Sequence, residues 1–185
     1  MSVIRSASSP SDPSTLGTID TPLGPMIAAA RDEGVCLLEY TTPGRLESQL
    51  ARIRRRFGSD PAPGGHPLID RLSEELARYF DGTLTVFATP LLIDGTTFQV
   101  RVWNALLRIP YGETRSYDDL ARELGSVGAQ RAVGHANGSN PLAIVVPCHR
   151  VINKSGKLGG YGGELWRKQA LLALESRGAT QTTLF

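Results

Sequence analysis

The sequence predicts an α+β protein in which a small antiparallel-sheet domain with helices precedes a mainly helical domain. Short apolar runs separated by turn residues between Gly17 and Tyr40 indicate the sheet. Apolar residues recur at helical spacing through most of the remaining chain, and the short apolar run 143–146 indicates one further strand. The turn pair Asp94-Gly95 marks the boundary. We therefore expect a tail over 1–16, an α/β domain over 17–94 and a second domain over 95–185.

Length and composition limit the classes of protein to consider. The chain has 185 residues, a formal net charge of +2 and a pI near 8.7. Charge this weak does not by itself indicate a nucleic-acid partner. No apolar run approaches the ~18 residues that span a membrane, and we expect a cytoplasmic protein with reduced cysteines. The two cysteines and three histidines lack the spacing of metal ligands, so no metal is predicted.

The first domain is expected to combine the sheet with two amphipathic helices. Residues before Gly17 are rich in Ser and Pro and predict a disordered tail. Cys36 lies in an apolar run and is expected to be core. The first helix has apolar residues at helical spacing: Leu46, Leu50, Ile53 and Phe57. An arginine cluster on its other face is interpreted as solvated surface. The second helix begins after His66, a surface or capping residue, and ends at Asp81-Gly82.

Three helices are predicted next. Thr96 and Ser116 each begin a capping-box sequence that starts a helix, the first reaching about Ile109. The third helix has small residues on a core-facing side and bare or polar positions opposite. The core-facing set is Ala129, Ala132, Val133 and Ala136, and the opposite set is Arg131, Gly134, His135 and Gly138. Two helices joined by a short turn have the outline of a helix-turn-helix, which alone is a weak signal.

The segment around Cys148 is the candidate reactive site. The apolar run 143–146 predicts a buried strand that carries Cys148 at its polar end. His149 offers a base and Arg150 a permanent cation, and such neighbours lower a thiol's pKa below about 8.5. A buried structural cysteine is the alternative, and Arg150 fits an ion-paired structural role better than an activating one.

Two later features frame this site. Five glycines surround Tyr161 within 155–163, and they predict a wall over a ligand, since no phosphate-binding motif is present. The last helix, about Glu164 to Ser176, is expected to align a stripe of four residues: Leu165, Lys168, Leu172 and Glu175. An acid at the end of an apolar row needs a partner.

Pro147-Cys148-His149-Arg150-Val151 resembles the signature of the methylated-DNA-protein-cysteine methyltransferases, also called O6-alkylguanine-DNA alkyltransferases. The resemblance covers roughly residues 95–176 in the family's order. Its other elements are Phe98-Gln99, Val102-Trp103, Ser116-Tyr117, Arg131 to Gly134, Asn140-Pro141, Gly160-Tyr161 and Lys168 to Glu175. The first domain resembles the family's variable, ribonuclease H-like domain only loosely and carries no assigned catalytic residue.

The resemblance implies a function and roles for individual residues. Cys148 would irreversibly accept a methyl or alkyl group from O6-alkylguanine, or O4-alkylthymine, in double-stranded DNA, with no cofactor. His149 would deprotonate Cys148 through a bridging water, and Glu175 would orient His149. Asn140 would brace the turn, and Tyr117 would crowd the target phosphate and protonate the leaving base. Arg131 would fill the gap left by the flipped guanine. The implied DNA-binding set is Tyr117, Ala129, Arg131, Ala132 and Gly134, and the implied substrate pocket is Val151, Tyr161, Gly162 and Gly163. A monomer that can cooperate along DNA is expected.

One departure and three alternatives accompany this interpretation. Gly162 stands where some relatives have serine, which removes a hydroxyl contact to O6 but keeps a backbone N–H. A cysteine hydrolase using Cys148 and His149 would turn over and need an oxyanion hole, for which the sequence has no strong signal. A non-catalytic lesion-recognition protein would lack the cysteine. A transcriptional regulator would need a fused domain, for which the short tail leaves no room.

Overall fold

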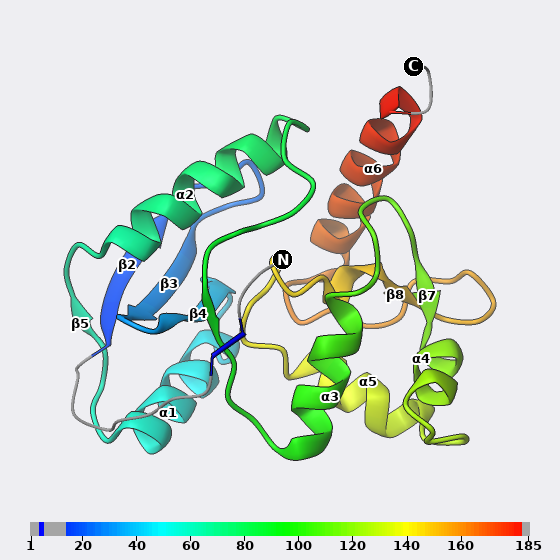
Figure 1. The fold of residues 1–185 in the computed structure, drawn as a ribbon, viewed down its shortest axis with the longest axis horizontal. Coiled ribbons are helices and arrows are strands. Elements are labelled where there is room, and N and C mark those ends of the chain that lie inside the picture. Colours follow the sequence, from blue (N-terminus) through cyan, green and yellow to red (C-terminus); the bar gives the residue numbers. More distant parts are fainter. Residues whose placement is uncertain (1–3, 6–13, 183–185) are drawn as a thin grey trace. The chain divides into compact units, whose positions relative to one another are not determined.

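The computed structural model describes residues 4–5 and 14–182 and divides the chain into two compact units, Met1–Asp94 and Gly95–Phe185. The predicted α+β class is confirmed: the first unit holds a sheet with helices, and the second is mainly helical (Figure 1). None of the helices in the described ranges has both the length and the apolar character needed to cross a bilayer.

The first unit is built on a six-stranded sheet with the order β1-β6-β4-β3-β2-β5. Its centre is the expected antiparallel meander of β2 (Thr15–Ile19), β3 (Met26–Arg31) and β4 (Gly34–Tyr40). Three two-residue strands extend it in parallel pairings: β1 (Ile4–Arg5), β5 (Ala62–Pro63) and β6 (Leu91–Leu92). Gly34 must be glycine, because a Cβ there would lie 2.8 Å from the Leu92 backbone nitrogen.

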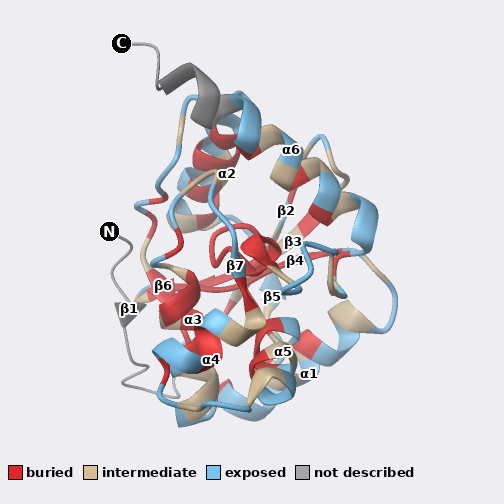
Figure 2. Ribbon diagram, turned by 90° about the vertical axis from the view of Figure 1, so that its right-hand side faces the viewer, coloured by how far each residue is buried: buried red, intermediate tan, exposed pale blue. Residues whose placement is uncertain are grey.

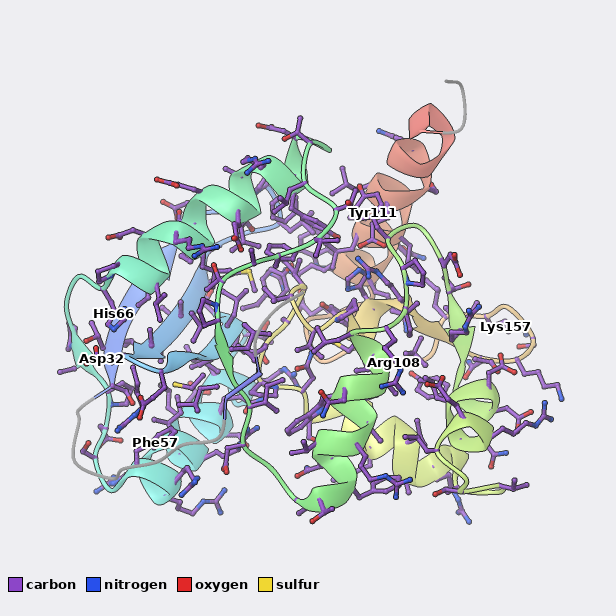
Figure 3. All side chains as sticks on the ribbon, in the orientation of Figure 1. Asp32, Phe57, His66, Arg108, Tyr111 and Lys157 are labelled. Atoms are coloured by element: carbon purple, nitrogen blue, oxygen red, sulfur yellow. The ribbon has the colours of Figure 1, made fainter. Side chains whose placement is uncertain are left out.

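Two helices pack against this sheet, on opposite sides of its strands in Figure 1. The helix α1 (Arg45–Phe57) buries Ile53 and Phe57 in a cluster that includes Cys36, so the core assignment of Cys36 is confirmed. The helix α2 (Pro67–Phe80) begins at His66, whose Nδ1 accepts a hydrogen bond from the Leu68 N–H. His66 therefore is a capping residue, and its Nε2 faces Asp32 at 3.6 Å (Figure 3).

The prediction of a disordered tail over 1–16 is wrong for two segments that form strands. Ile4–Arg5 pairs with β6, and Thr15 and Leu16 belong to β2. Both segments gain backbone partners from distant parts of the chain, which a composition argument does not detect. Residues 1–3 and 6–13 lie outside the described residues.

The second unit contains the predicted helices. Both capping boxes are present: Thr96 begins α3 (Thr97–Leu106) and Ser116 begins α4 (Tyr117–Glu123). The next helix, α5 (Gln130–Gly138), packs on both α3 and α4. Fully buried Trp103 donates its indole N–H to the Ala136 carbonyl at 2.8 Å, which fixes α3 against α5. Arg131, His135 and Gly138 on the opposite side of α5 are exposed. The prediction that Ala132 faces the core is wrong, because Ala132 is exposed.

The strand predicted over 143–146 is wrong. These residues are buried but form turns, and Cys148–Arg150 forms a short 3-10 helix, η1. Figure 2 shows the buried residues of the described chain in red. A true strand, β8 (Val151–Ile152), follows and pairs in parallel with β7 (Arg115–Ser116). The final helix α6 (Leu165–Thr182) buries Lys168, Leu171 and Glu175, whereas Leu165 is exposed and Leu172 half-buried.

Candidate active site around Cys148

The Cys148 thiol lies at the start of η1 and is only 4% exposed. Its Sγ is 3.1 Å from the Nδ2 of Asn140, a side chain that is completely buried. The same Nδ2 donates to the Val146 carbonyl at 2.8 Å, and Asn140 Oδ1 accepts the Leu142 N–H at 3.0 Å. Asn140 therefore holds both ends of the turn that delivers the thiol and points a donor at the sulfur.

Backbone strain accompanies this turn. Ile144 has a φ of 70°, in the left-handed region that a β-branched residue rarely adopts. A conformation of this kind costs about 1–3 kcal/mol and persists only where its surroundings impose it. The Asn140 hydrogen bonds on either side of Ile144 provide that constraint. The turn is thus a braced loop, and the buried apolar run does not need strand pairing to be stable.

His149 and Arg150 both converge on Glu175 of α6. His149 Nε2 lies 2.8 Å from Glu175 Oε1, and the two side chains are almost completely inaccessible. Arg150 donates to both oxygens of the same carboxylate, each at 2.9 Å, and also to the Ile109 carbonyl. The interpretation of Arg150 as an ion-paired structural residue is confirmed.

Electrostatics fix the protonation of this group. Burial alone would raise the pKa of Glu175, but the hydrogen bonds from His149 and Arg150, together with the charge of Arg150, lower it to about 2. Burial lowers the pKa of His149 below its usual 6.5, which favours the neutral imidazole at pH 7. An ionised carboxylate only accepts, so Nε2 carries the proton and Nδ1 has the lone pair. In the described part of the chain Nδ1 has no hydrogen-bond partner.

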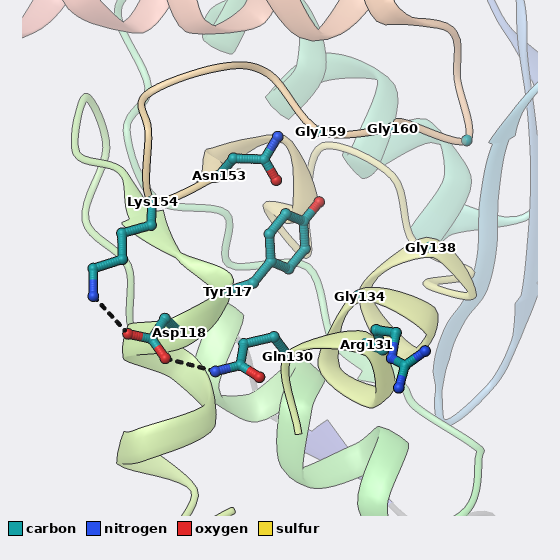
Figure 4. A pocket seen from close by; sticks show the side chains of 11 residues that line it. Tyr117, Asp118, Gln130, Arg131, Gly134, Gly138, Asn153, Lys154, Gly159 and Gly160 are labelled. Carbon is teal, nitrogen blue, oxygen red and sulfur yellow. Dashed lines mark hydrogen bonds and ion pairs between the residues drawn. The ribbon is translucent and has the colours of Figure 1, made fainter. Parts of the chain in front are cut away.

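A cavity of about 540 Å³ opens in the second unit (Figure 4). Its lining comes from α4, the exposed side of α5 and the glycine-rich segment. The predicted residues in its wall are Tyr117, Arg131, Gly134 and Gly162. Within the described residues, Cys148, Val151, Tyr161 and Gly163 do not line it, and neither do Ala129 and Ala132.

Tyr117 lies between two glycines. A Cβ on Gly159 would come within 2.9 Å of the Tyr117 hydroxyl, and one on Gly134 would lie 3.8 Å from its ring. Burial, and then the charge of Cys148, raises the pKa of Tyr117 above its usual 10, so the phenol keeps its proton. Gly159 of the glycine-rich segment therefore packs directly on the Tyr117 side chain, and a residue with a Cβ would not fit there.

Two residues of the site were not predicted. Asn137 is buried on α5 and donates to the Cys148 carbonyl at 3.3 Å. Lys168 is completely buried on α6 and donates to the Val151 carbonyl at 2.5 Å. Burial lowers the pKa of Lys168, while the Cys148 charge opposes this shift. The sequence placed Lys168 on the same side of the last helix as Glu175, but the residue spacing did not indicate that its ammonium group is buried.

Comparisons with known proteins agree with this geometry. A family model described as "6-O-methylguanine DNA methyltransferase, DNA binding domain" matches residues 97–177. A Mycobacterium tuberculosis protein named methylated-DNA--protein-cysteine methyltransferase is 48% identical over 169 residues, covering 91% of this chain and 96% of the relative. One of the same name from Methanosarcina acetivorans is 41% identical over 156 residues, covering 84% and 94%.

Solved structures give the same result. M. tuberculosis OGT in complex with DNA superposes with a TM-score of 0.75 at 46% identity, covering 87% of this chain and 92% of that chain. The fold and the site thus define a DNA-binding transferase. The chain belongs to the family of methylated-DNA–protein-cysteine methyltransferases, and the resemblance seen in the sequence is confirmed.

Proposed function

We propose that this protein repairs DNA by transferring a methyl or other alkyl group from the O6 of guanine, or the O4 of thymine, to Cys148. The observation that carries the proposal is the pairing of Glu175 with His149 directly after the cysteine. That pairing leaves a basic nitrogen, Nδ1, without a partner among the described residues. Membership of the family supports the same reaction.

The first step is deprotonation of the thiol. Successive residues of a 3-10 helix point about 120° apart, so we propose that a water carries the proton from Cys148 Sγ to His149 Nδ1. Ionised Glu175 holds the imidazole in the required tautomer and stabilises the cation that forms. The Asn140 Nδ2 at 3.1 Å donates to the sulfur and stabilises its negative charge.

The second step is an in-line displacement. The Cys148 thiolate attacks the saturated carbon, a carbon–sulfur bond forms, and the carbon–oxygen bond breaks with its electron pair on the base. Tyr117, whose raised pKa keeps it protonated, supplies the proton that neutralises the leaving guanine. Backbone N–H groups of 161–163 would face the base, and the absence of a hydroxyl at Gly162 leaves this contact to the backbone.

The helix α5 is proposed to enter the minor groove. That groove is about 6 Å wide, and a helix fits closely only where its side chains are small. The exposed side of α5 meets this requirement with Ala132 and Gly138, and Ala129 and Gly134 are half-buried. Arg131 is exposed and has no ion pair among the described residues, so it can replace the extruded nucleotide in the stack.

The thioether product determines how the protein acts. No group around Cys148 can cleave a carbon–sulfur bond, so each chain reacts once and is consumed. We propose that the chain acts on duplexes containing O6-alkylguanine as a monomer that can cooperate along DNA. Neither Cys36 nor Cys148 forms a disulfide bond, which suits the reducing cytoplasm.

Mixing the protein with a duplex that carries labelled O6-methylguanine tests the function. Peptide mass mapping should find the label on the Cys148 peptide at no more than one per chain. Cys148→Ser should take up none, and Cys36→Ser should match the wild type because Cys36 is buried core. Repeated turnover, or label elsewhere, would contradict the proposal.

A further inference from the structure

A hydrogen bond links the two helices that form the wall of the cavity. Gln130, the first residue of α5, donates its Nε2 to Asp118 Oδ1 of α4 at 2.7 Å. Both side chains line the cavity next to Arg131 (Figure 4). Gln130 makes no other side-chain hydrogen bond in the described part of the chain. This amide is therefore anchored at one end, directly beside the residue proposed to enter the DNA.

The anchor fixes which end of the Gln130 amide faces Asp118. The Gln130 hydrogen bond, helped by Lys154 and Arg122, lowers the pKa of Asp118, so this carboxylate is ionised at neutral pH. An ionised carboxylate only accepts hydrogen bonds, which requires the NH₂ group of Gln130 to face it. The Oε1 consequently points away from Asp118, as Figure 4 shows. A flipped amide would place two acceptors together.

The carboxylate itself is compensated and need not repel DNA. Arg122 Nη2 lies 2.6 Å from Asp118 Oδ2, and Lys154 Nζ lies 3.4 Å from the same oxygen. Both cations are largely exposed, with 56% and 74% of their side chains accessible. The cluster therefore presents positive charge to solvent, and Gln130, a residue of the cavity wall, keeps one neutral acceptor, Oε1, that is not bonded to Asp118.

We propose that Gln130 reads the base pair next to the lesion and favours guanine there. The minor groove displays acceptors on every base pair, and the guanine N2 amino group is its one donor. An oriented amide oxygen can pair with that donor and gains nothing from an A·T pair. Gln130 is a specificity-determining residue, and Asp118 is the residue that positions it. This inference rests on the proposed function and on entry of α5 through the minor groove.

Single-turnover transfer rates with modified flanking pairs test the proposal. The wild-type protein should repair O6-methylguanine roughly three- to tenfold faster beside a G·C pair than beside inosine·C, which lacks only the N2 amino group. Diaminopurine·T, which adds that group to an A·T pair, should be as fast as G·C. Replacing N7 of the flanking guanine by carbon changes only the major groove and should have no effect.

Variants distinguish the role of Gln130 from the role of Asp118. Gln130→Met keeps the length of the side chain but loses the acceptor, and should transfer at one rate in all contexts. Asp118→Asn can donate or accept, so the amide is no longer fixed and the preference should shrink. Gln169→Ala changes an exposed glutamine on α6 and should behave as wild type.

Three results would overturn the inference: equal wild-type rates in all contexts, an inosine effect that survives in Gln130→Met, or sensitivity to the N7 change. A full preference in Asp118→Asn would overturn the role of Asp118. Absence of transfer from every duplex would instead contradict the proposed function, so the two failures are distinguishable.

Discussion

The Glu175 carboxylate accepts four hydrogen bonds. It accepts from His149, from two nitrogens of Arg150 and from the Gly112 backbone N–H, while 1% of its side chain is accessible. Such a group is stable when ionised only because every neighbour compensates it. The proposed base and the structural cation therefore depend on the same residue.

Replacing Glu175 by Gln should destabilise the protein by about 3 kcal/mol at pH 7, because the buried Arg150 guanidinium loses its charged partner. The folded-state pKa of Glu175, about 2, lies below its ordinary 4.5. A lowered pKa contributes stability that is present above about pH 4.5 and is lost as pH falls toward 2. Urea unfolding of wild type and variant should therefore converge as the pH is lowered through this range.

The exposed Glu113, paired with Arg115 at 3.5 Å, provides the matched control. Glu113→Gln should change the free energy of unfolding by less than about 0.5 kcal/mol at every pH. A constant gap between wild type and Glu175→Gln down to pH 3 would show that the charge of Glu175 is not what stabilises the site.

At the scale of elements, the helices α1 and α5 differ in what their exposed arginines already bind. On α1, Arg54 faces Asp60 at 3.6 Å and Arg56 binds Asp94 at 2.8 Å. On α5, Arg131 is exposed without such a partner among the described residues. The family resemblance separated these cases, but residue spacing alone could not, because Asp94, which pairs with Arg56, is brought to α1 by folding.

We expect Arg131→Ala to weaken base flipping far more than Arg54→Ala. The first change removes the side chain proposed to occupy the vacated stack, and the second removes only an exposed charge. Fluorescence of a base analogue opposite the lesion measures extrusion directly. Equal losses in the two variants would contradict the assignment of α5 as the DNA-reading helix.

The same scale shows where sequence reasoning works and where it fails. Helix starts were predictable because Thr96 and Ser116 cap them through contacts within three residues. The run 143–146 was assigned wrongly because a buried apolar segment looks alike as strand or turn. Its conformation depends on Asn140, and the burial of Lys168 depends on packing of α6 against η1. Neither contact is encoded in local spacing.

At the scale of the whole molecule, the fold class follows from periodicity, whereas sheet order does not. The strands β1, β5 and β6 have two residues each and exist through parallel pairing with distant segments. No pattern of two residues predicts a strand. The candidate site shows the same division: Cys148, His149 and Glu175 could be named from the sequence, whereas the cavity wall could be named only in part, without Asp118 and Gln130.

Alkylation of Cys148 should lower the stability of the whole protein. The thiol is 4% exposed and touches Asn140, so an added methyl group overfills the site at a cost of about 1–3 kcal/mol. Thermal melting after reaction with a methylated duplex should shift down by several degrees. Cys148→Ser treated in the same way should melt unchanged, and an unaltered midpoint in the wild type would contradict this expectation.

Cys36 gives the molecule a second sulfur with the opposite chemistry. Burial raises its pKa to about 12, and its Sγ donates to the Ala29 carbonyl at 3.4 Å. A thiol of this kind stays protonated and inert toward maleimides and iodoacetamide at neutral pH. Titration of the native protein with such reagents should therefore count only the molecules whose Cys148 is not yet alkylated. The active fraction of a preparation can then be measured without DNA.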